Sequence, residues 1–306
     1  MKSYITGLAV AIALAGCANA QSTATGGRLP YTPANYSHAD SGDPVLYAVS
    51  TFGTGGAEMY DFKTGTRIGS LPGEYGNATT VCIGAKHDVW EAEGGYSKGS
   101  MVEYAPGAQK ARAMIVTKYG PPYACSVNRN TGDLAVPIRA RIAIFPRAPR
   151  FAPIYYTPVD HARYTSCVYD GSGNLFVVGH TRRRGGVFLV ELPRGTTTFR
   201  TITLDRKLRK AGGIAWDGTN LAIGDGATST IYRFSVSGSQ AKTIGKTVLE
   251  GGLDVYYPFS IYNGTVTAAL AQTTSAAGFA FWKYPEGGTP FKTFSQGYYE
   301  SFAVAK

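Results

Sequence analysis

The feature that most constrains the fold of this chain is an internal repeat of about 45 residues that runs from Val45 to the C-terminus. Each copy holds an apolar strand, a turn that carries Asp or Asn and Gly, and a second apolar strand, as in Ile214–Leu221 (IAWDGTNL). A period of this length, with four short strands per copy, is typical of a β-propeller blade. The equivalent second-strand residues, spaced by 43, 45, 41, 46 and 45 positions, are Leu46, Val89, Leu134, Leu175, Leu221 and Val266.

The two ends of the repeat region complement each other. The first copy opens on a second strand at Val45–Ser50, whereas Ser301–Ala305 at the C-terminus matches the first strands of the other copies. Each copy also contains a third apolar or aromatic strand that ends at a Pro or Gly turn, which brings the number of copies to six. We therefore predict an all-β fold, a six-bladed β-propeller closed by pairing of the C-terminal strand into the first blade.

The composition agrees with many short strands. Charged residues make up only 16% of the chain, against roughly 25% in an average soluble domain. Gly (39 residues) and Tyr (21 residues) are abundant, which favours strands joined by tight turns over helical bundles or coiled coils. Four His and four Cys leave little material for a metal cluster. The hydrophobic content of 44% suffices for a large core and excludes global disorder.

The N-terminus is typical of an exported protein. The apolar run Tyr4–Leu14 is too short for a bilayer span of roughly 20 residues, but it has the length of a signal-peptide core. It ends in Leu14–Cys17 (LAGC), which resembles the bacterial lipobox and implies a lipid thioether on Cys17. A competing cut after Ala18–Ala20 (ANA), before Gln21, would release a secreted protein instead.

The chain therefore divides into three parts. Residues 1–17 are interpreted as a lipoprotein signal peptide, 18–43 as a flexible linker rich in small and polar residues, and 44–306 as the propeller. We expect an exported monomer that is lipid-anchored to a bacterial membrane and faces the periplasm or the cell surface. Despite the net charge of +10, nucleic acid is not an expected partner, because an exported chain does not meet it.

The turn Asp170–Leu175 (DGSGNL), followed by apolar strands, resembles those of NHL-repeat and gluconolactonase-type six-bladed propellers. Together with the lipobox, the region 44–306 is similar to a group of bacterial propeller lipoproteins. The resemblance implies the fold. It leaves the function open, because this scaffold carries lactonases, dehydrogenases and pure binding modules alike.

Three further cysteines, Cys82, Cys125 and Cys167, lie on the inner strands of successive blades. Relative to their turns, Cys82 and Cys125 point to opposite sheet faces, so they can meet between neighbouring blades. We predict a Cys82–Cys125 disulfide, with Cys167 free, in an oxidising exported compartment. The alternative is three buried reduced thiols.

The ligand-binding residues are expected at the mouth of the axial channel. Tyrosines precede most first strands and offer an apolar face with a hydroxyl, suited to sugars, although they can also act as wedges between blades. Arginines crowd the neighbouring hairpins and suit carboxylate or phosphate groups, although they can also form a plain solvated face. The candidates are Tyr75, Tyr123, Tyr164, Tyr257, Tyr299, Arg139, Arg141, Arg182, Arg183 and Arg184.

Catalysis has less support in the sequence. Gluconolactonase-type enzymes hold a divalent ion with a Glu, an Asn and an Asp, and Glu300 resembles the Glu of that family. Asn77 and Asp254 are the only candidates to complete such a site. We therefore expect a binding module without a cofactor, whose partner is an anionic glycan, a lipid or an envelope protein. A metal-dependent hydrolase or lactonase that uses Glu300 is the alternative.

Overall fold

The structure is a computed structural model. It describes residues 42–50, 55–73, 77–94, 99–182, 185–251, 255, 257–270, 278–294 and 297–306. The predicted signal peptide, Cys17 and most of the predicted linker lie outside these ranges. The described residues form strands and turns without a helix, so none of them makes a helix able to cross a bilayer.

Four of the hydrogen-bonded sheets have four strands each. In three of them the chain runs outward strand by strand in antiparallel order, as expected for strands joined by tight turns. Their strands are β4 (Ala78–Ile83), β5 (Val89–Gly94), β6 (Gly99–Tyr104) and β7 (Ala111–Thr117); β8 (Ser126–Val127), β9 (Leu134–Ile138), β10 (Arg141–Phe145) and β11 (Ile154–Tyr156); and β20 (Ser260–Tyr262), β21 (Thr265–Ala269), β22 (Phe279–Lys283) and β24 (Lys292–Phe294).

The fourth sheet joins the two ends of the chain. It has the order β25–β1–β2–β3, with β25 (Tyr299–Ala305) beside β1 (Val45–Ser50), β2 (Glu58–Asp61) and β3 (Arg67–Ser70). The C-terminal strand pairs with β1 from Val45 opposite Ala305 to Ser50 opposite Tyr299. The predicted closure by the C-terminal strand is thus confirmed.

The remaining strands form one larger, nine-stranded sheet. It contains two antiparallel runs whose outermost strands meet in a short parallel pairing, Thr203 opposite Gln240 and Leu204 opposite Ala241. The hydrogen-bonded sheets therefore number five among the described residues, because the ten-residue β19 reaches its neighbours on both sides. The strands are β12 (Ala162–Tyr169), β13 (Leu175–Thr181), β14 (Val187–Leu192), β15 (Arg200–Leu204), β16 (Ala211–Trp216), β17 (Leu221–Asp225), β18 (Thr230–Ser237), β19 (Gln240–Leu249) and β23 (Gly287–Gly288).

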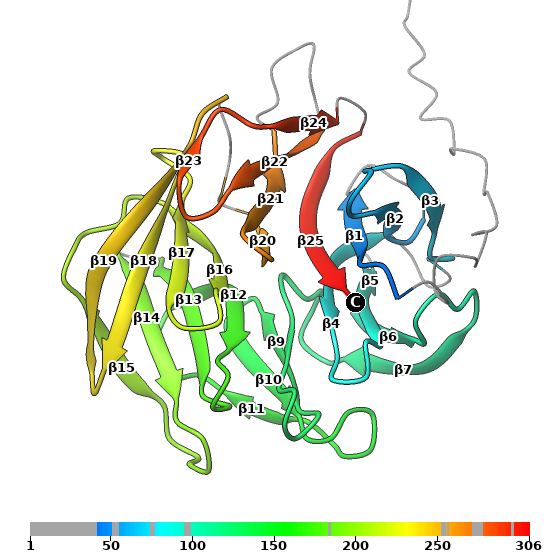
Figure 1. Cartoon of the computed structure of the whole chain (residues 1–306). Helices are drawn as coiled ribbons and strands as arrows, with labels where there is room; N and C mark the ends of the chain where they lie inside the picture. The colour runs from blue at the N-terminus through cyan, green and yellow to red at the C-terminus, as the bar shows by residue number, and fades with distance from the viewer. Residues whose placement is uncertain are drawn as a thin grey trace, which may run out of the picture.

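The sheets are arranged around a common centre in a propeller-like manner (Figure 1). The inner strands follow one another around this centre, and each contacts the next: β25 with β4, β4 with β8, β8 with β12, β12 with β16, β16 with β20, and β20 with β25. Outer strands such as β7, β11 and β19 lie at the periphery. The inner strands therefore surround an axis, and the segments that precede them gather at one end of it.

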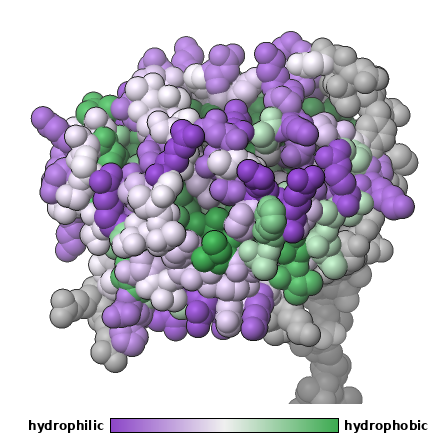
Figure 2. Space-filling view, turned by 90° about the horizontal axis from the view of Figure 1, so that it is seen from below, coloured by the Kyte–Doolittle hydropathy of each residue, from purple (hydrophilic) through white to green (hydrophobic). Residues whose placement is uncertain are grey.

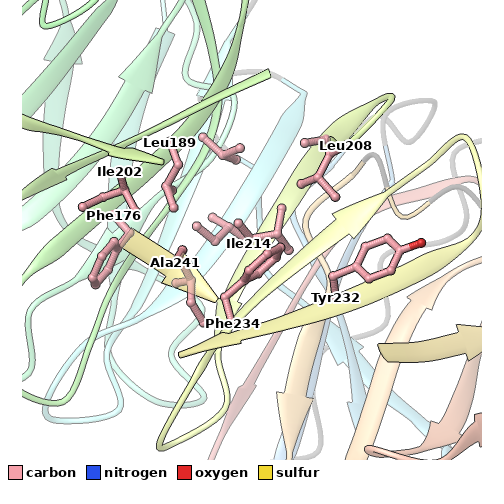
Figure 3. Close-up of a cluster of buried hydrophobic side chains, with 12 residues drawn as sticks. Phe176, Leu189, Ile202, Leu208, Ile214, Tyr232, Phe234 and Ala241 are labelled. Carbon is pink, nitrogen blue, oxygen red and sulfur yellow. The ribbon is translucent and has the colours of Figure 1, made fainter. Parts of the chain in front are cut away.

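The core lies between the faces of adjacent sheets. Figure 3 shows one such layer, in which Phe176, Leu189 and Ile202 from β13–β15 face Ile214 and Phe234 from β16 and β18. Successive side chains along each strand point to opposite faces of its sheet. Apolar side chains on both faces therefore pack against the two neighbouring sheets. Side-chain burial between the sheets is the main stabilising contribution to the arrangement.

Two cysteines lie in the layer between the β4–β7 and β8–β11 sheets, and Cys167 lies in the next layer, between the β8–β11 sheet and β12–β15. Cys82 and Cys125 form a disulfide, with Cα atoms 5.7 Å apart, as predicted. Cys167 is free and buried, and burial raises the pKa of its thiol. A buried thiol with a raised pKa is a structural residue and a poor nucleophile.

Candidate functional site

One cavity of about 500 Å³ lies at the end of the axis where the inner strands begin. Its walls come from the starts of β4, β12 and β25, from the segments that precede β8 and β20, and from the β9–β10 hairpin. Because these elements belong to different sheets, the cavity is on the axis and every sheet that reaches it can contribute a side chain. The lining residues are Asn77, Ala78, Thr79, Gly94, Pro121, Pro122, Tyr123, Arg139, Arg163, Thr165, Tyr257, Pro258 and Glu300.

A β-bulge at the start of an inner strand places a side chain in this cavity. In β25, Ser301 pairs with Val49 and Tyr299 with Ser50, so Glu300 is the extra residue. The same shift makes Thr79 the extra residue of β4 and Thr165 the extra residue of β12. A bulge interrupts the alternation of faces and redirects one side chain. All three bulged residues line the cavity, whereas the residues on both sides of each are buried.

The bulged threonines also connect neighbouring inner strands. The Thr79 hydroxyl donates a hydrogen bond of 3.2 Å to the carbonyl of Pro122, which precedes β8. The Thr165 hydroxyl lies 3.4 Å from the carbonyl oxygen of Gly212, in β16. The third bulge differs in chemistry, because a carboxylate stands at Glu300 where the other two sheets have hydroxyls. Glu300 therefore brings a carboxylate into the cavity.

Two guanidinium groups give the cavity a cationic side. Arg163 and Arg139 are exposed, and both line it. The Arg163 guanidinium carbon lies 5.2 Å from the centre of the Tyr123 ring, a cation–π distance that holds both groups at the wall. Arg139 is placed by the β9–β10 hairpin, where its φ of 46° belongs to the tight turn between these strands. The site therefore combines two positive charges, aromatic faces and one carboxylate.

Five of the residues singled out from the sequence are brought together by the structure. Tyr123, Tyr257, Arg139, Asn77 and Glu300 all line the cavity, although they are far apart along the chain. Four of them precede an inner strand or lie at the start of one, which is the position that the repeat identified. The cavity thus brings together some of these segments.

Two of the predicted tyrosines lie in the core instead. Tyr164 is fully buried, its hydroxyl accepts a hydrogen bond of 3.0 Å from the backbone N–H of Val159, and burial raises its pKa to about 12. Tyr299 is 5% exposed, and its hydroxyl donates to Glu58 at 2.7 Å. Each tyrosine directly precedes a bulged residue, so it points between the sheets while its neighbour faces the cavity. Their role is that of wedges.

The other predicted residues are not in the cavity or are not described. The Arg141 guanidinium stacks on Tyr119, 4.3 Å from the centre of that ring, outside the cavity. Arg182 is exposed at the β13–β14 hairpin and does not line it either. The remaining candidates, which lie outside the described residues, are Tyr75, Arg183, Arg184 and Asp254.

Arg163, Thr79 and Thr165 belong to the site but were not predicted from the sequence. The signal available for Arg163 was its place immediately before Tyr164, at a junction already identified as part of the rim. No sequence pattern distinguished the two threonines, because a bulge changes the sheet face to which a side chain points without changing the spacing of the repeat. The structure therefore adds one charged residue and two hydroxyl groups to the predicted site.

The donor set for a divalent cation is small. Among the described lining residues, Glu300 supplies the single carboxylate and Asn77 the single side-chain amide. Ca²⁺ takes six to eight oxygen ligands, and Arg139 and Arg163 add positive charge to the same cavity. In the described residues no group of three or more His, Cys, Asp or Glu side chains has the arrangement of a metal site. The described side chains fit an anion with hydroxyl groups better than a cation.

No family model matches the sequence, and no curated protein matches it. Several solved structures, however, are similar to this chain. A chain in a nidogen/laminin complex superposes with a TM-score of 0.66 and 15% identity over 86% of this chain and 98% of its own. The β-propeller domain of Cps50 (Swd1) from Myceliophteria thermophila gives 0.56 and 15% identity, covering 83% of each chain. A candidate 6-phosphogluconolactonase from Bacteroides fragilis gives 0.59 and 10% identity over 87% of this chain and 85% of its own. At such low identities the likeness concerns the fold alone: the chain has an all-β, propeller-like fold.

Proposed function

We propose that this chain is an exported, lipid-anchored, six-bladed β-propeller that binds an acidic carbohydrate in its axial cavity and does not catalyse a reaction. The observation that carries the proposal is the lining of that cavity. It holds Arg139 and Arg163 together with the rings of Tyr123 and Tyr257, and it places Glu300 in the same space.

The six-blade count is supported by the inner strands. The ring of contacts from β25 through β4, β8, β12, β16 and β20 back to β25 has one member for each copy of the repeat. Within the nine-stranded sheet, β12–β15 and β16–β19 are each a complete antiparallel run, joined by only the short β15–β19 pairing. This edge contact merges two blades by hydrogen bonding without removing either.

The ligand class follows from the chemistry of the lining. A guanidinium suits a carboxylate through paired, charge-assisted hydrogen bonds, and Arg139 and Arg163 offer two. The faces of Tyr123 and Tyr257, with the nearby proline rings, suit the apolar face of a sugar. Glu300 disfavours a densely charged ligand such as a polyphosphate, but its carboxylate accepts hydrogen bonds from hydroxyl groups. A sugar that carries both hydroxyls and one carboxylate, a uronic acid, satisfies all three.

The test is calorimetry on the full chain in mild detergent, with a uronic-acid oligosaccharide and a neutral oligosaccharide of the same length as probes. We expect the acidic oligosaccharide to bind and the neutral one to bind much more weakly. Arg163→Gln and Arg139→Gln should each weaken binding about tenfold or more, because a hydrogen bond to a charged group contributes about 1.5–3 kcal/mol.

Arg194→Gln is the matched control. Arg194 is an exposed arginine on the β14–β15 turn, beside the Asp170–Leu175 turn and so at the opposite end of β12 from Arg163. Its removal changes the net charge by the same amount and should leave binding unchanged. If all three variants weaken binding equally, the attraction is a general effect of net charge, and the cavity is not the site.

A metal-dependent lactonase is the second candidate, favoured by one observation. Glu300, which resembles the Glu of that family, and Asn77, one of the two candidates to complete such a site, line the same cavity. Elemental analysis of the purified chain and of Glu300→Gln separates the two candidates. A stoichiometric divalent ion that is lost in the variant, together with lactone hydrolysis by the wild type, would replace the binding proposal by the enzymatic one.

A further inference from the structure

A short connection between two strands carries four cations. Residues 205–210 (DRKLRK), here named the basic loop, link β15 to β16 and contain four Lys or Arg and one Asp, so their net charge is 4 − 1 = +3. Leu208, in the middle of the loop, is 3% exposed and packs into the core layer of Figure 3. The four cations, all exposed, are Arg206, Lys207, Arg209 and Lys210.

The basic loop runs from the periphery of the molecule to its axis. It begins after β15, the outermost strand of its antiparallel run, and ends at β16, an inner strand (Figure 1). Because the inner strands begin at the end of the axis where the cavity lies, the loop crosses that same end of the molecule. Gly212 lies two residues after Lys210, and its carbonyl oxygen is 3.4 Å from the hydroxyl of Thr165, which lines the cavity. The basic loop therefore leads outward from the wall of the cavity.

The bulge of β16 has no side chain. It consists of Gly212 and Gly213, which are opposed by the single Gly224. The bulges of β4, β12 and β25 place Thr or Glu side chains in the cavity, whereas none of the lining residues belongs to β16. At this bulge, therefore, no side chain stands between the cavity and the basic loop.

The backbone of the basic loop is held in place. Asp225 is 2% exposed, and its carboxylate accepts hydrogen bonds from the backbone N–H groups of Arg209 at 3.0 Å and Lys210 at 2.9 Å. Near the outer end of the loop, the guanidinium carbon of Arg206 lies 3.8 Å from the centre of the Tyr232 ring. A loop that is ordered before binding loses less conformational entropy when a ligand binds.

The acidic residue of the loop lies at its outer end. Asp205 accepts hydrogen bonds from the hydroxyl and the backbone N–H of Thr243, which lower the pKa of its carboxyl. The positive charge is therefore greater toward the axis. Exposed charge alone does not mark a site, because Figure 2 shows hydrophilic residues over much of the surface that is seen from below Figure 1. The basic loop differs in that its cations follow one another along a backbone that ends at the cavity.

We propose that the basic loop is a second anion subsite, and that the ligand is an oligosaccharide of several uronic acid units that extends from the axial cavity along this loop. The inference rests on the proposed binding of an acidic carbohydrate in the cavity. A uronic acid chain carries a carboxylate on every unit, and Lys and Arg side chains suit carboxylates. A segment of six residues spans at most about 20 Å, several times the length of a sugar ring, so a single sugar cannot contact both the cavity and the outer end of the loop.

The experiment is calorimetry on the full chain in mild detergent, with digalacturonate and octagalacturonate as probes. We expect octagalacturonate to bind more tightly, and added salt to weaken its binding more steeply. Lys207→Gln with Arg209→Gln should lower the affinity for octagalacturonate at least about fivefold, because the pair removes two exposed charge contacts. The affinity for digalacturonate should stay within about twofold, because a pocket of this size encloses a small ligand.

Lys86→Gln with Arg150→Gln is the matched control. Both residues are exposed, and they lie in the turns after β4 and β10, at the opposite end of the axis from the cavity. This pair also removes one Lys and one Arg, and it should leave the binding of both probes unchanged. Thermal unfolding followed by circular dichroism should show that both double variants fold as the parent does, because exposed substitutions usually change stability little.

Equal affinities of the wild type for the two probes overturn the inference, and so does an equal loss of both probes in the basic-loop variant. An equal loss in the control pair also overturns it, because net charge alone would then explain the effect. Arg163→Gln separates the inference from the proposed function. If it weakens both probes while the basic-loop variant binds both normally, the inference fails and the proposed function stands. If neither probe binds the wild type, or if Arg163→Gln binds both unchanged, the proposed function fails, and the extension from the cavity fails with it.

Discussion

Phe279 is the side chain on which closure of the ring is expected to depend most. It is fully buried in β22 and stacks on Phe294 of its own sheet, with ring centres 4.4 Å apart. It also contacts the closing sheet, edge to face with Tyr60 and Tyr299, each at 5.1 Å, and at 5.5 Å from Phe302. Its ring therefore fills the layer between the last sheet and the one that contains both chain ends.

Phe279→Ala should lower the free energy of unfolding by about 4 kcal/mol, since Phe-to-Ala changes in a core cost about 3–5 kcal/mol and aromatic pairs add to burial. For a domain of this size that corresponds to a melting temperature lower by about 8 °C, at roughly 2 °C per kcal/mol. Phe279→Leu, which keeps most of the volume, should lose less than about 1.5 kcal/mol.

Urea unfolding, followed by circular dichroism and tryptophan fluorescence, measures both variants. Phe151→Ala is the matched control, because this ring is 54% exposed and its loss should change stability by less than about 0.5 kcal/mol. The reasoning is refuted if Phe279→Ala is no less stable than the control, or if it loses stability only in a separate early transition. The layer would then not support the closed ring as a unit.

Three further outcomes are expected. Burial, and then the neighbouring Glu93, raise the pKa of Glu91, so the folded state favours the neutral acid. The free energy of unfolding should therefore fall as the pH rises above about 4.5. Glu91→Gln should flatten this pH dependence in unfolding measurements between mildly acidic and neutral pH. Replacing both Cys82 and Cys125 by Ser opens a loop with a sequence separation of 43 and should cost up to about 4 kcal/mol, measured against the wild type with and without reductant. Deleting residues 299–306 removes β25 from the β1 edge, and a truncated chain that melts at the wild-type temperature would contradict the closure.

The sequence predicts the arrangement of strands well, because the repeat indicates where strands and turns lie along the chain. Val45–Ser50 lacked a partner and Ser301–Ala305 was a spare strand, and the two pair as expected. The merging of two runs through β15 and β19 was not predictable from the repeat. It depends on how far an outer strand extends, and outer strands carry only a weak apolar pattern.

The site is less predictable than the scaffold for a geometric reason. Tyr123 and Tyr164 occupy similar places in the repeat, yet the first lines the cavity and the second is buried. In β12 the bulge at Thr165 separates the residue that faces the axis from its buried neighbours. Spacing along the chain identifies the junction, but only the backbone register shows which of two adjacent side chains enters the cavity.

The bulges have a consequence for how such a protein can change. At Thr79, Thr165 and Glu300 the bulged residue lines the cavity, while the residues directly before and after it are buried. A substitution at Glu300 should alter what is recognised, whereas substitutions at Thr79 and Thr165 also remove hydroxyl groups that connect neighbouring inner strands. A change of this one residue, Glu300, by evolution or in the laboratory, should then give a new specificity while the arrangement of strands stays the same.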